Sequence, residues 1–169
     1  MMPYPYIMFD WGDTIMKDDP SLDIPMVEWP RVEAIEGAGE VLRALHVDRT
    51  IVMATSADRS GEAEIRAALR RVDLEAYFDH IFCFKNTGLQ KSSIDFYLFI
   101  LESLKIKPTD ILMVGDHFEK DVQLANSVGI AAVWLNMKDR EDRQGTNYQT
   151  IHRLSDLLSL LKGSRIADH

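Results

Sequence analysis

The sequence is poor in cysteine, in positive charge and in long apolar runs, and each shortage excludes a class of protein. Its one cysteine, Cys83, cannot form an intramolecular disulfide, which argues for a reducing compartment. Lysine and arginine number 19 against 27 acidic residues, so the net charge of −8 leaves no broad cationic surface for nucleic acid or anionic lipid. No apolar run approaches the roughly 20 residues that cross a bilayer. We therefore expect a cytoplasmic protein with no nucleic-acid partner and no membrane partner.

The length and the composition are those of one globular unit. The 169 residues compare with roughly 150 residues in an average domain. Hydrophobic residues make up 46% and charged residues 27%, which excludes a disordered chain. The opening residues have no basic start and reach Asp10 early, so we expect no signal peptide. We expect residues 1–169 to form a single domain.

Short apolar runs alternate along the chain with stretches of helical periodicity. The runs predict buried strands at residues 6–9, 50–54, 81–84, 111–114 and 130–135. Apolar residues at helical spacing predict helices that end near residue 45 or cover residues 60–72, 94–104, 122–128 and 154–161. Residues 15–36, with three prolines, and residues 138–150 predict irregular loops. This alternation is typical of an α/β fold, a three-layer, Rossmann-like parallel sheet with helices on both faces.

Polar residues follow the predicted strands, where parallel sheets bind their ligands. These residues are Asp10 and Gly12 after the first strand, Thr55 and Ser56 after the second, Lys91 before the helix that follows the third, and Asp116 and Asp121 after the fourth. Because the carboxyl ends of parallel strands share one edge, we expect these side chains to meet although they are far apart in sequence.

The chemistry of this set favours phosphoryl transfer. Crowded carboxylates repel one another unless a divalent cation lies between them, and hard oxygen ligands suit Mg²⁺. Lys91 would keep Asp10 ionised and neutralise phosphate oxygens. The hydroxyl of Thr55 or of Ser56, with the N–H groups of the next helix, would bind the phosphate, and the sequence leaves open which hydroxyl is the chief one. A screened carboxylate facing a bound phosphoryl group predicts an aspartyl-phosphate intermediate at Asp10.

Taken in order, the motifs resemble those of the haloacid dehalogenase (HAD) superfamily of phosphohydrolases. FDWGDTI resembles the first motif, in which an aspartate nucleophile begins a D-x-D-x-T pattern. VMATSA resembles the second motif, GLQKSSIDFY the lysine motif and VGDHFEKD the acidic fourth motif. The likeness covers nearly the whole chain and implies a Mg²⁺-dependent phosphatase that hydrolyses phosphoric monoesters.

The resemblance also implies a role for each matched residue. Asp10 would be the nucleophile, Thr55 the phosphate-binding hydroxyl and Lys91 the motif-three lysine, for which Lys85 is the competing position. Mg²⁺ would be held by Asp10, Asp116 and the backbone carbonyl of Gly12, with Asp121 as a further ligand or an orienting partner.

The chain departs from the family at Gly12, where the second aspartate of the first motif normally protonates the leaving group. General acid catalysis contributes roughly 10²–10⁴ in rate, so its loss constrains the function. The leaving group needs little protonation, or Asp13 or His117 supplies the proton, or the chain binds without turnover. The alternative to an active phosphatase is therefore a catalytically impaired phosphate- or partner-binding module.

The chain also has no room for a sizeable cap domain. Only the 22 residues from 15 to 36 separate the first motif from its helix. An uncapped site predicts space for a bulky phosphorylated substrate, or a partner subunit of a homo-oligomer that covers the site.

Overall fold

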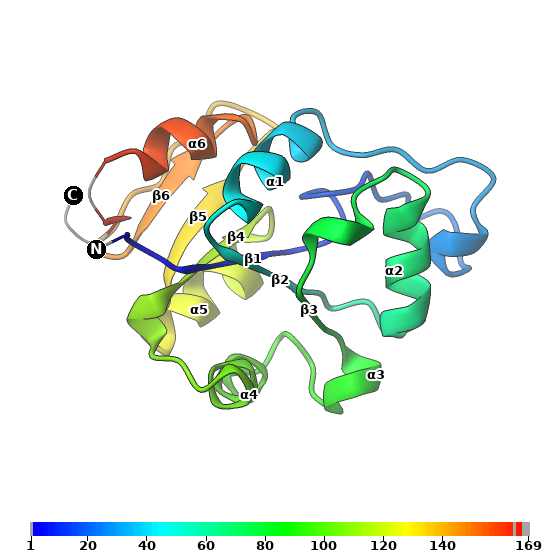
Figure 1. The fold of residues 1–169 in the computed structure, drawn as a ribbon, viewed down its shortest axis with the longest axis horizontal. Coiled ribbons are helices and arrows are strands. Elements are labelled where there is room, and N and C mark those ends of the chain that lie inside the picture. Colours follow the sequence, from blue (N-terminus) through cyan, green and yellow to red (C-terminus); the bar gives the residue numbers. More distant parts are fainter. Residues whose placement is uncertain (1, 164, 167–169) are drawn as a thin grey trace.

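A six-stranded parallel sheet forms the centre of the computed structural model, which describes residues 2–163 and 165–166 (Figure 1). Its strands are β1 (Tyr6–Phe9), β2 (Thr50–Ala54), β3 (His80–Phe82), β4 (Ile111–Gly115), β5 (Ala131–Leu135) and β6 (Tyr148–Ile151). Their order in the sheet is β3-β2-β1-β4-β5-β6. The chain order reverses between β1 and β4, and ligands of such sheets bind in the crevice at that point. The predicted three-layer α/β fold is confirmed.

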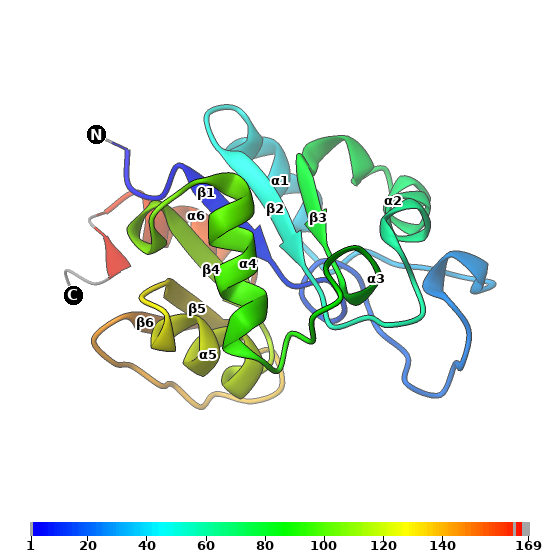
Figure 2. The ribbon, with the colours of Figure 1, turned by 90° about the horizontal axis from the view of Figure 1, so that it is seen from below.

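Helices cover both faces of the sheet. α1 (Ala38–His46) and α6 (Asp156–Leu161) lie on one face, and α4 (Ile94–Leu104) and α5 (Leu124–Ser127) lie on the other (Figures 1 and 2). Side chains of β1 alternate between the layers, because Ile7 and Phe9 belong to the core under α1 whereas Met8 belongs to the core over α4. Burial on both sides explains why the strands are continuously apolar.

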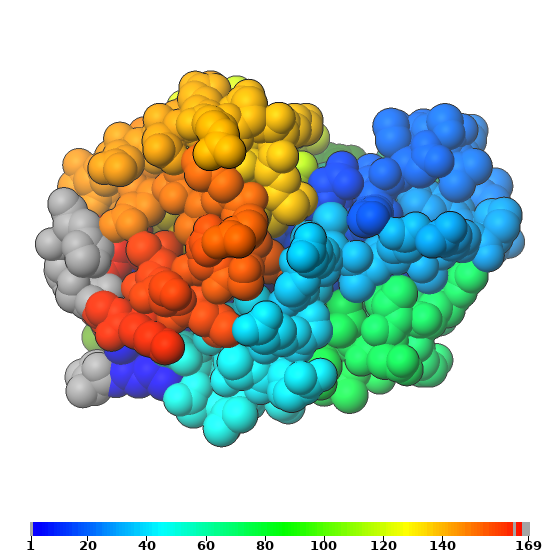
Figure 3. Space-filling model, turned by 90° about the horizontal axis from the view of Figure 1, so that it is seen from above, coloured from blue at the N-terminus to red at the C-terminus, as the bar shows by residue number. Residues whose placement is uncertain are grey.

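The remaining helical elements are short. They are α2 (Glu62–Arg70), α3 (Phe84–Thr87), the 3₁₀ turns η1 (Met26–Glu28), η2 (Glu75–Tyr77) and η3 (Pro108–Asp110), and the π-helix η4 (Phe118–Gln123). No helix in the described part of the chain has the length and apolar character needed to cross a bilayer. Residues 15–36, irregular as predicted apart from η1, run past the carboxyl end of the sheet and form a lobe that projects from the molecule (Figure 3).

Three elements differ from the prediction. Residues 148–151 form the edge strand β6 instead of the end of a polar loop; only Ile151 of this strand is buried, so its sequence carries no apolar run. β3 ends at Phe82, and Cys83 is the N-cap of α3, where its N–H donates to Asn86 Oδ1 at 2.9 Å. The helix predicted from residue 122 begins earlier, at Phe118, as the π-helix η4.

Candidate active site

The sheet itself brings Asp10 and Asp116 together. β1 and β4 are neighbours in register, with Phe9 opposite Val114, so the residues that follow these strands emerge side by side. The N–H of Asp10 donates to the carbonyl of Val114 at 3.0 Å, which continues the pairing into the site. The predicted convergence at the carboxyl edge is thus what the fold produces.

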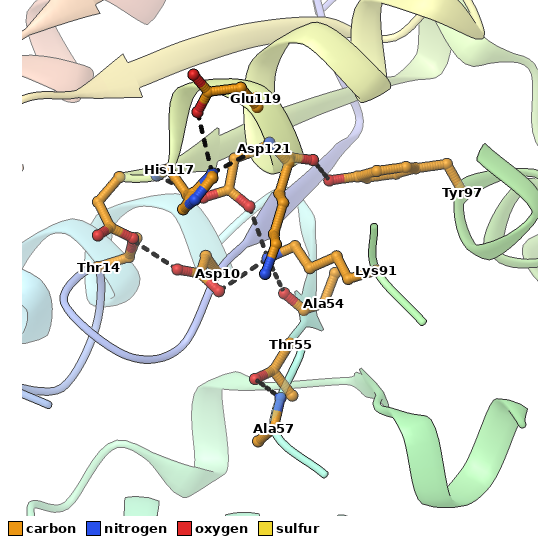
Figure 4. A network of polar contacts seen from close by, with 12 residues as sticks. Asp10, Thr14, Ala54, Thr55, Ala57, Lys91, Tyr97, His117, Glu119 and Asp121 are labelled. Carbon is orange, nitrogen blue, oxygen red and sulfur yellow. Dashed lines mark hydrogen bonds and ion pairs between the residues drawn. The ribbon is translucent and has the colours of Figure 1, made fainter. Parts of the chain in front are cut away.

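Lys91 reaches this edge from the connection between α3 and α4. Its Nζ lies 2.8 Å from Asp10 Oδ1, 2.7 Å from Asp121 Oδ1 and 2.7 Å from the carbonyl oxygen of Ala54 (Figure 4). The competing Lys85 instead donates to the carbonyl of Arg59. Burial lowers the pKa of the Lys91 ammonium, but Asp10 and Asp121 outweigh burial and raise it, so Lys91 remains a cation.

The carboxylates are crowded, and their pKa values diverge as a result. Ligand oxygens of Asp10, Asp116 and Asp121 all lie within 4.8 Å of one another. Burial raises the pKa of Asp10, but Lys91 together with hydrogen bonds from Asp116 and the N–H of Trp11 holds it below the ordinary value. Burial and the neighbouring Asp10 raise the pKa of Asp116 to about 8, and burial raises that of Asp121 to about 6 despite Lys91. One cation does not balance three crowded carboxylates, of which Asp10 and Asp121 are buried and Asp116 is half-buried, so the cluster retains a proton near neutral pH.

This donor set fits a divalent cation. Asp121 Oδ1 is buried 2.7 Å from Lys91 Nζ, and the Asp121 carboxylate lies close to those of Asp10 and Asp116. A carboxylate oxygen has more than one lone pair, so the ion pair with Lys91 leaves Asp121 able to contact a metal ion as well. Carboxylate oxygens from Asp10, Asp116 and Asp121 are the hard donors that Mg²⁺ prefers.

The π-helix η4 explains how Asp121 turns inward. The carboxylate of Asp121 lies against Gly115, where any added Cβ would overlap it, so this close approach requires glycine. Asp121 Oδ2 accepts a hydrogen bond from the N–H of His117 at 2.9 Å. The hydroxyl of the buried Tyr97 donates to the carbonyl of Lys120 at 2.6 Å and fixes the turn from the α4 side. Such π turns are frequent at functional sites, and no sequence signal marks this one.

Hydroxyl groups border the carboxylates. Thr14 Oγ1 lies 3.3 Å from both Asp10 Oδ2 and Asp116 Oδ1 and can donate to either. The Thr55 hydroxyl accepts a hydrogen bond from the N–H of Ala57 at 3.1 Å, which leaves its own hydrogen for a ligand. Thr55 is buried at the bottom of the pocket, whereas Ser56 lines the pocket from an exposed position.

Asp18 is a residue of this site that sequence reasoning missed. If Gly12 carried a Cβ, the nearest heavy atoms would be Asp18 Cβ at 3.3 Å, Cγ at 3.5 Å and Oδ2 at 3.6 Å. The two expected surrogates are engaged locally: Asp13 Oδ1 accepts from the N–H of Asp18 at 3.0 Å, and His117 Nδ1 accepts from the N–H of Lys120 at 3.3 Å. Asp18 lies in an irregular segment without a motif, so only the folded loop reveals its position.

The site opens as a pocket of about 340 Å³. Its floor carries Asp10, Thr55, Lys91, Asp116 and Asp121, which we call the charged floor. A second border is apolar and comes from five residues of the projecting lobe: Leu22, Ile24, Pro25, Met26 and Trp29. This volume is at the lower end of the range for small-molecule sites, so one small ligand fills it.

Comparison with known proteins agrees with this geometry. The family model of haloacid dehalogenase-like hydrolases matches residues 26–129, more than half of the chain. The match includes Thr55, Lys91, Asp116 and Asp121 but begins after Asp10. The association of Asp10 with the other four therefore rests on the structure.

The curated relatives match this chain over only part of their own length. The chain is 29% identical over 97 residues to glyceraldehyde 3-phosphate phosphatase of Methanocaldococcus jannaschii, covering 56% of this chain and 42% of that protein. It is 29% identical over 129 residues to pyrimidine 5'-nucleotidase YjjG of Escherichia coli, covering 73% and 56%. The chain thus spans about half the length of these curated relatives. The crystal structure of a HAD phosphatase from Thermococcus onnurineus superimposes with a TM-score of 0.77 at 20% identity, over 95% of this chain and 99% of that one, which shows the shared fold.

Proposed function

The chain belongs to the haloacid dehalogenase-like hydrolases, and from this premise we propose that it is a Mg²⁺-dependent phosphatase that uses Asp10 as its nucleophile. The observation that carries the proposal is the charged floor, in which Lys91 Nζ lies 2.8 Å from Asp10 Oδ1 and two further carboxylates converge on the same point. Two relatives are named as a glyceraldehyde 3-phosphate phosphatase and a pyrimidine 5'-nucleotidase, and these names support hydrolysis of phosphate esters as the reaction.

In the first step a carboxylate oxygen of Asp10 attacks phosphorus, and the bond from phosphorus to the alcohol oxygen breaks. The bonding electrons leave with that oxygen, which takes a proton. Water then attacks the phosphorus of the aspartyl-phosphate, phosphate departs and the Asp10 carboxylate is restored. Lys91 offsets the negative charge of the phosphoryl oxygens throughout, and the Thr55 and Ser56 hydroxyls hydrogen-bond to them.

The metal would be held by the carboxylates of Asp10, Asp116 and Asp121 and by the carbonyl of Gly12. When bound, Mg²⁺ would neutralise phosphoryl charge and relieve the repulsion between the carboxylates. The ligand oxygens of Asp10, Asp116 and Asp121, all within 4.8 Å of one another, support a place for Asp121 among the ligands. Thr14, hydrogen-bonded to Asp10 and Asp116, would orient both.

The geometry favours Asp18 as the source of the leaving-group proton. Its carboxyl group occupies the space beside Gly12, on the border of the same pocket as Asp10. Burial and the neighbouring Asp13 raise the pKa of Asp18, which favours the protonated form that a proton donor needs. The loop therefore supplies a carboxyl group from residue 18 where the family pattern has one at residue 12.

The test is hydrolysis of aryl and acyl phosphates with Mg²⁺. We expect turnover that requires Mg²⁺ and that Asp10→Asn abolishes, with a phosphoenzyme in the wild type that survives acid quenching and is cleaved by alkali or hydroxylamine, as an acyl phosphate is. An enzyme without Mg²⁺ dependence, or an active Asp10→Asn variant, would contradict the mechanism.

The second candidate, a binding module without turnover, is favoured by a single observation, the absence of a side chain at Gly12. Beryllium fluoride with Mg²⁺ mimics a phosphoryl group and separates the two functions. Binding of this analogue by a protein that turns over no phosphate ester would establish the second candidate.

The organisation of the protein completes the proposal. We propose a single domain without a sizeable cap, in which residues 15–36 border the site and a second copy of the chain covers its open side. A cytoplasmic location suits Cys83, which is buried and forms no disulfide.

A further inference from the structure

An apolar surface borders the pocket opposite its charged floor. Its members are neighbours in the projecting lobe and we call them the apolar wall: Leu22, Ile24, Pro25, Met26 and Trp29. They line the same pocket as Asp10 and Lys91. Figure 3 shows from outside the projecting lobe that carries them.

Two members of the wall expose apolar surface to the pocket. Leu22 is 37% and Ile24 is 45% exposed, whereas Met26 and Trp29 are buried and anchor the wall in the core. Exposed apolar surface at a pocket marks a binding surface, because a ligand that covers it removes it from water. Neither side chain packs within the core cluster that holds Met26 and Trp29.

The wall is preformed. The guanidinium of Arg71, just after α2, donates to the carbonyls of Val27 at 3.1 Å, Trp29 at 2.6 Å and Pro30 at 3.3 Å. Within the wall, the indole N–H of Trp29 donates to the carbonyl of Ile24 at 3.0 Å. A surface fixed in this way loses little entropy when a ligand covers it.

The charges of the pocket oppose a second anionic group on the ligand. Arg59 lines the pocket, but it pairs with Asp23 at 2.5 Å. Lys120 is carried by η4 next to Asp121 and so belongs to the phosphoryl side. The exposed Asp58 adds negative charge to the border of the pocket.

Resting on the proposed phosphatase function, we propose that the substrates are phosphomonoesters whose alcohol part is an uncharged apolar chain or ring that lies against the apolar wall. The phosphoryl group binds at the charged floor and the apolar part covers Leu22 and Ile24. The pocket of about 340 Å³ limits this part to small-molecule size.

The experiment is a series of n-alkyl phosphates from ethyl to octyl. Their leaving groups have nearly the same basicity, so chain length changes contact with the wall and leaves the chemistry constant. We expect kcat/KM to rise about two- to four-fold per CH₂ until the wall is covered, because a buried CH₂ contributes up to about 0.8 kcal/mol. The gain should lie mainly in KM.

Matched variants locate the effect. Leu22→Ser with Ile24→Ser should flatten the dependence on chain length, with the loss in kcat/KM largest for octyl phosphate and smallest for ethyl phosphate. Val47→Ser is the control, since Val47 is 83% exposed and follows α1 at the opposite edge of the sheet. Equal melting temperatures exclude unfolding as the cause.

Binding of n-alkylphosphonates, which contain no hydrolysable ester, is measured by calorimetry with Mg²⁺ and separates the failures. Absence of turnover of aryl and alkyl phosphates alike, with a Kd that falls along the phosphonate series, would contradict the proposed function and support binding by the apolar wall. Turnover or binding that does not depend on chain length would contradict the proposal that the apolar wall binds the alcohol part of the substrate. A preference for bisphosphates or sugar phosphates of equal size would contradict it as well.

Discussion

Two acid-rich clusters follow strands of the sheet, and they behave in opposite ways. The charged floor is buried, and its carboxylates face one another across Lys91. The second cluster consists of Asn136, Asp139 and Asp142, which follow β5, and His152, which follows β6; we call it the loop cluster. There each acid has a neutral or cationic partner: Asn136 donates to Asp139 Oδ1 at 2.7 Å, and His152 Nε2 lies 2.7 Å from Asp142 Oδ1.

The pKa directions express the difference. Hydrogen bonds, chiefly from Asn136, lower the pKa of Asp139, and hydrogen bonds to Asn136 and Asp142 raise that of His152. Each shift in the loop cluster favours the charged form. In the charged floor, burial and like charge raise the pKa values of Asp116 and Asp121 and favour the neutral form. The comparison teaches that unrelieved repulsion, and not the number of ion pairs, marks the site.

The largest expected effect comes from the nucleophile. Asp10→Asn should lower kcat for aryl phosphates by about 10⁴-fold or more, since an amide cannot form the acyl phosphate. Asp142→Asn in the loop cluster should leave kcat unchanged. Steady-state kinetics on the two variants measure this, and an equal loss in both would erase the distinction between the clusters.

Lys91→Met should be the most destabilising single change in the charged floor. It leaves Asp10 and Asp121 buried without a counter-charge, and breaking a buried ion pair costs about 3–5 kcal/mol. Lys85→Met, at an exposed site, is the control. Denaturant unfolding in the absence of metal gives the free energy of unfolding of each variant. Equal values for Lys91→Met and Lys85→Met would mean that water solvates the carboxylates of the charged floor.

The pKa of Asp116 predicts how Mg²⁺ binding depends on pH. Its folded value of about 8 lies above the unfolded value, so the metal-free folded state holds an extra proton, and its stability falls as pH rises from about 4 to about 8. Mg²⁺ must displace this proton. The rise in Tm on adding Mg²⁺ should therefore grow between about pH 5 and about pH 8 and then level off. Asp116→Asn should flatten this profile, and a gain in Tm that is greatest at acid pH would refute it.

Gly12→Asp gives the smallest and most diagnostic effect. A Cβ at residue 12 lies 3.3 Å from Asp18 Cβ, so the new carboxylate competes with Asp18 for one space. We expect the single variant to gain little and Asp18→Asn to slow alkyl phosphates about 10²-fold, more than aryl phosphates. Combining Gly12→Asp with Asp18→Ala should restore alkyl turnover. Unchanged leaving-group dependence in Asp18→Asn would remove Asp18 from the mechanism.

The sequence predicted what depends on sheet topology. Asp10, Thr55 and Asp116 follow apolar strands, and parallel pairing brings such residues together without further information. Lys91 was also identified in advance, because it directly precedes a clear amphipathic helix. The edge strand β6 was missed because an exposed strand needs no apolar run.

Features set by loop conformation could not be predicted. Asp18 reaches Gly12 because Asp13 adopts a left-handed conformation (φ 59°) and its carboxylate accepts a hydrogen bond from the N–H of Asp18. The apolar wall depends on the hydrogen bonds from Arg71 to a segment about 40 residues away in sequence. Neither contact follows a periodicity that the sequence displays.

The three tryptophans of the chain all lie at the site, although they come from different segments. Trp11 and Trp29 line the pocket, and the indole N–H of Trp134 donates to the carbonyl of Asp116 at 2.9 Å. Indole emission responds to local polarity and hydrogen bonding, so the ultraviolet fluorescence of the unlabelled protein should report occupancy of the site. Titrations with metal ions and phosphate esters can then be followed optically, and Trp134→Phe would separate the signal of the carboxylates from that of the pocket border.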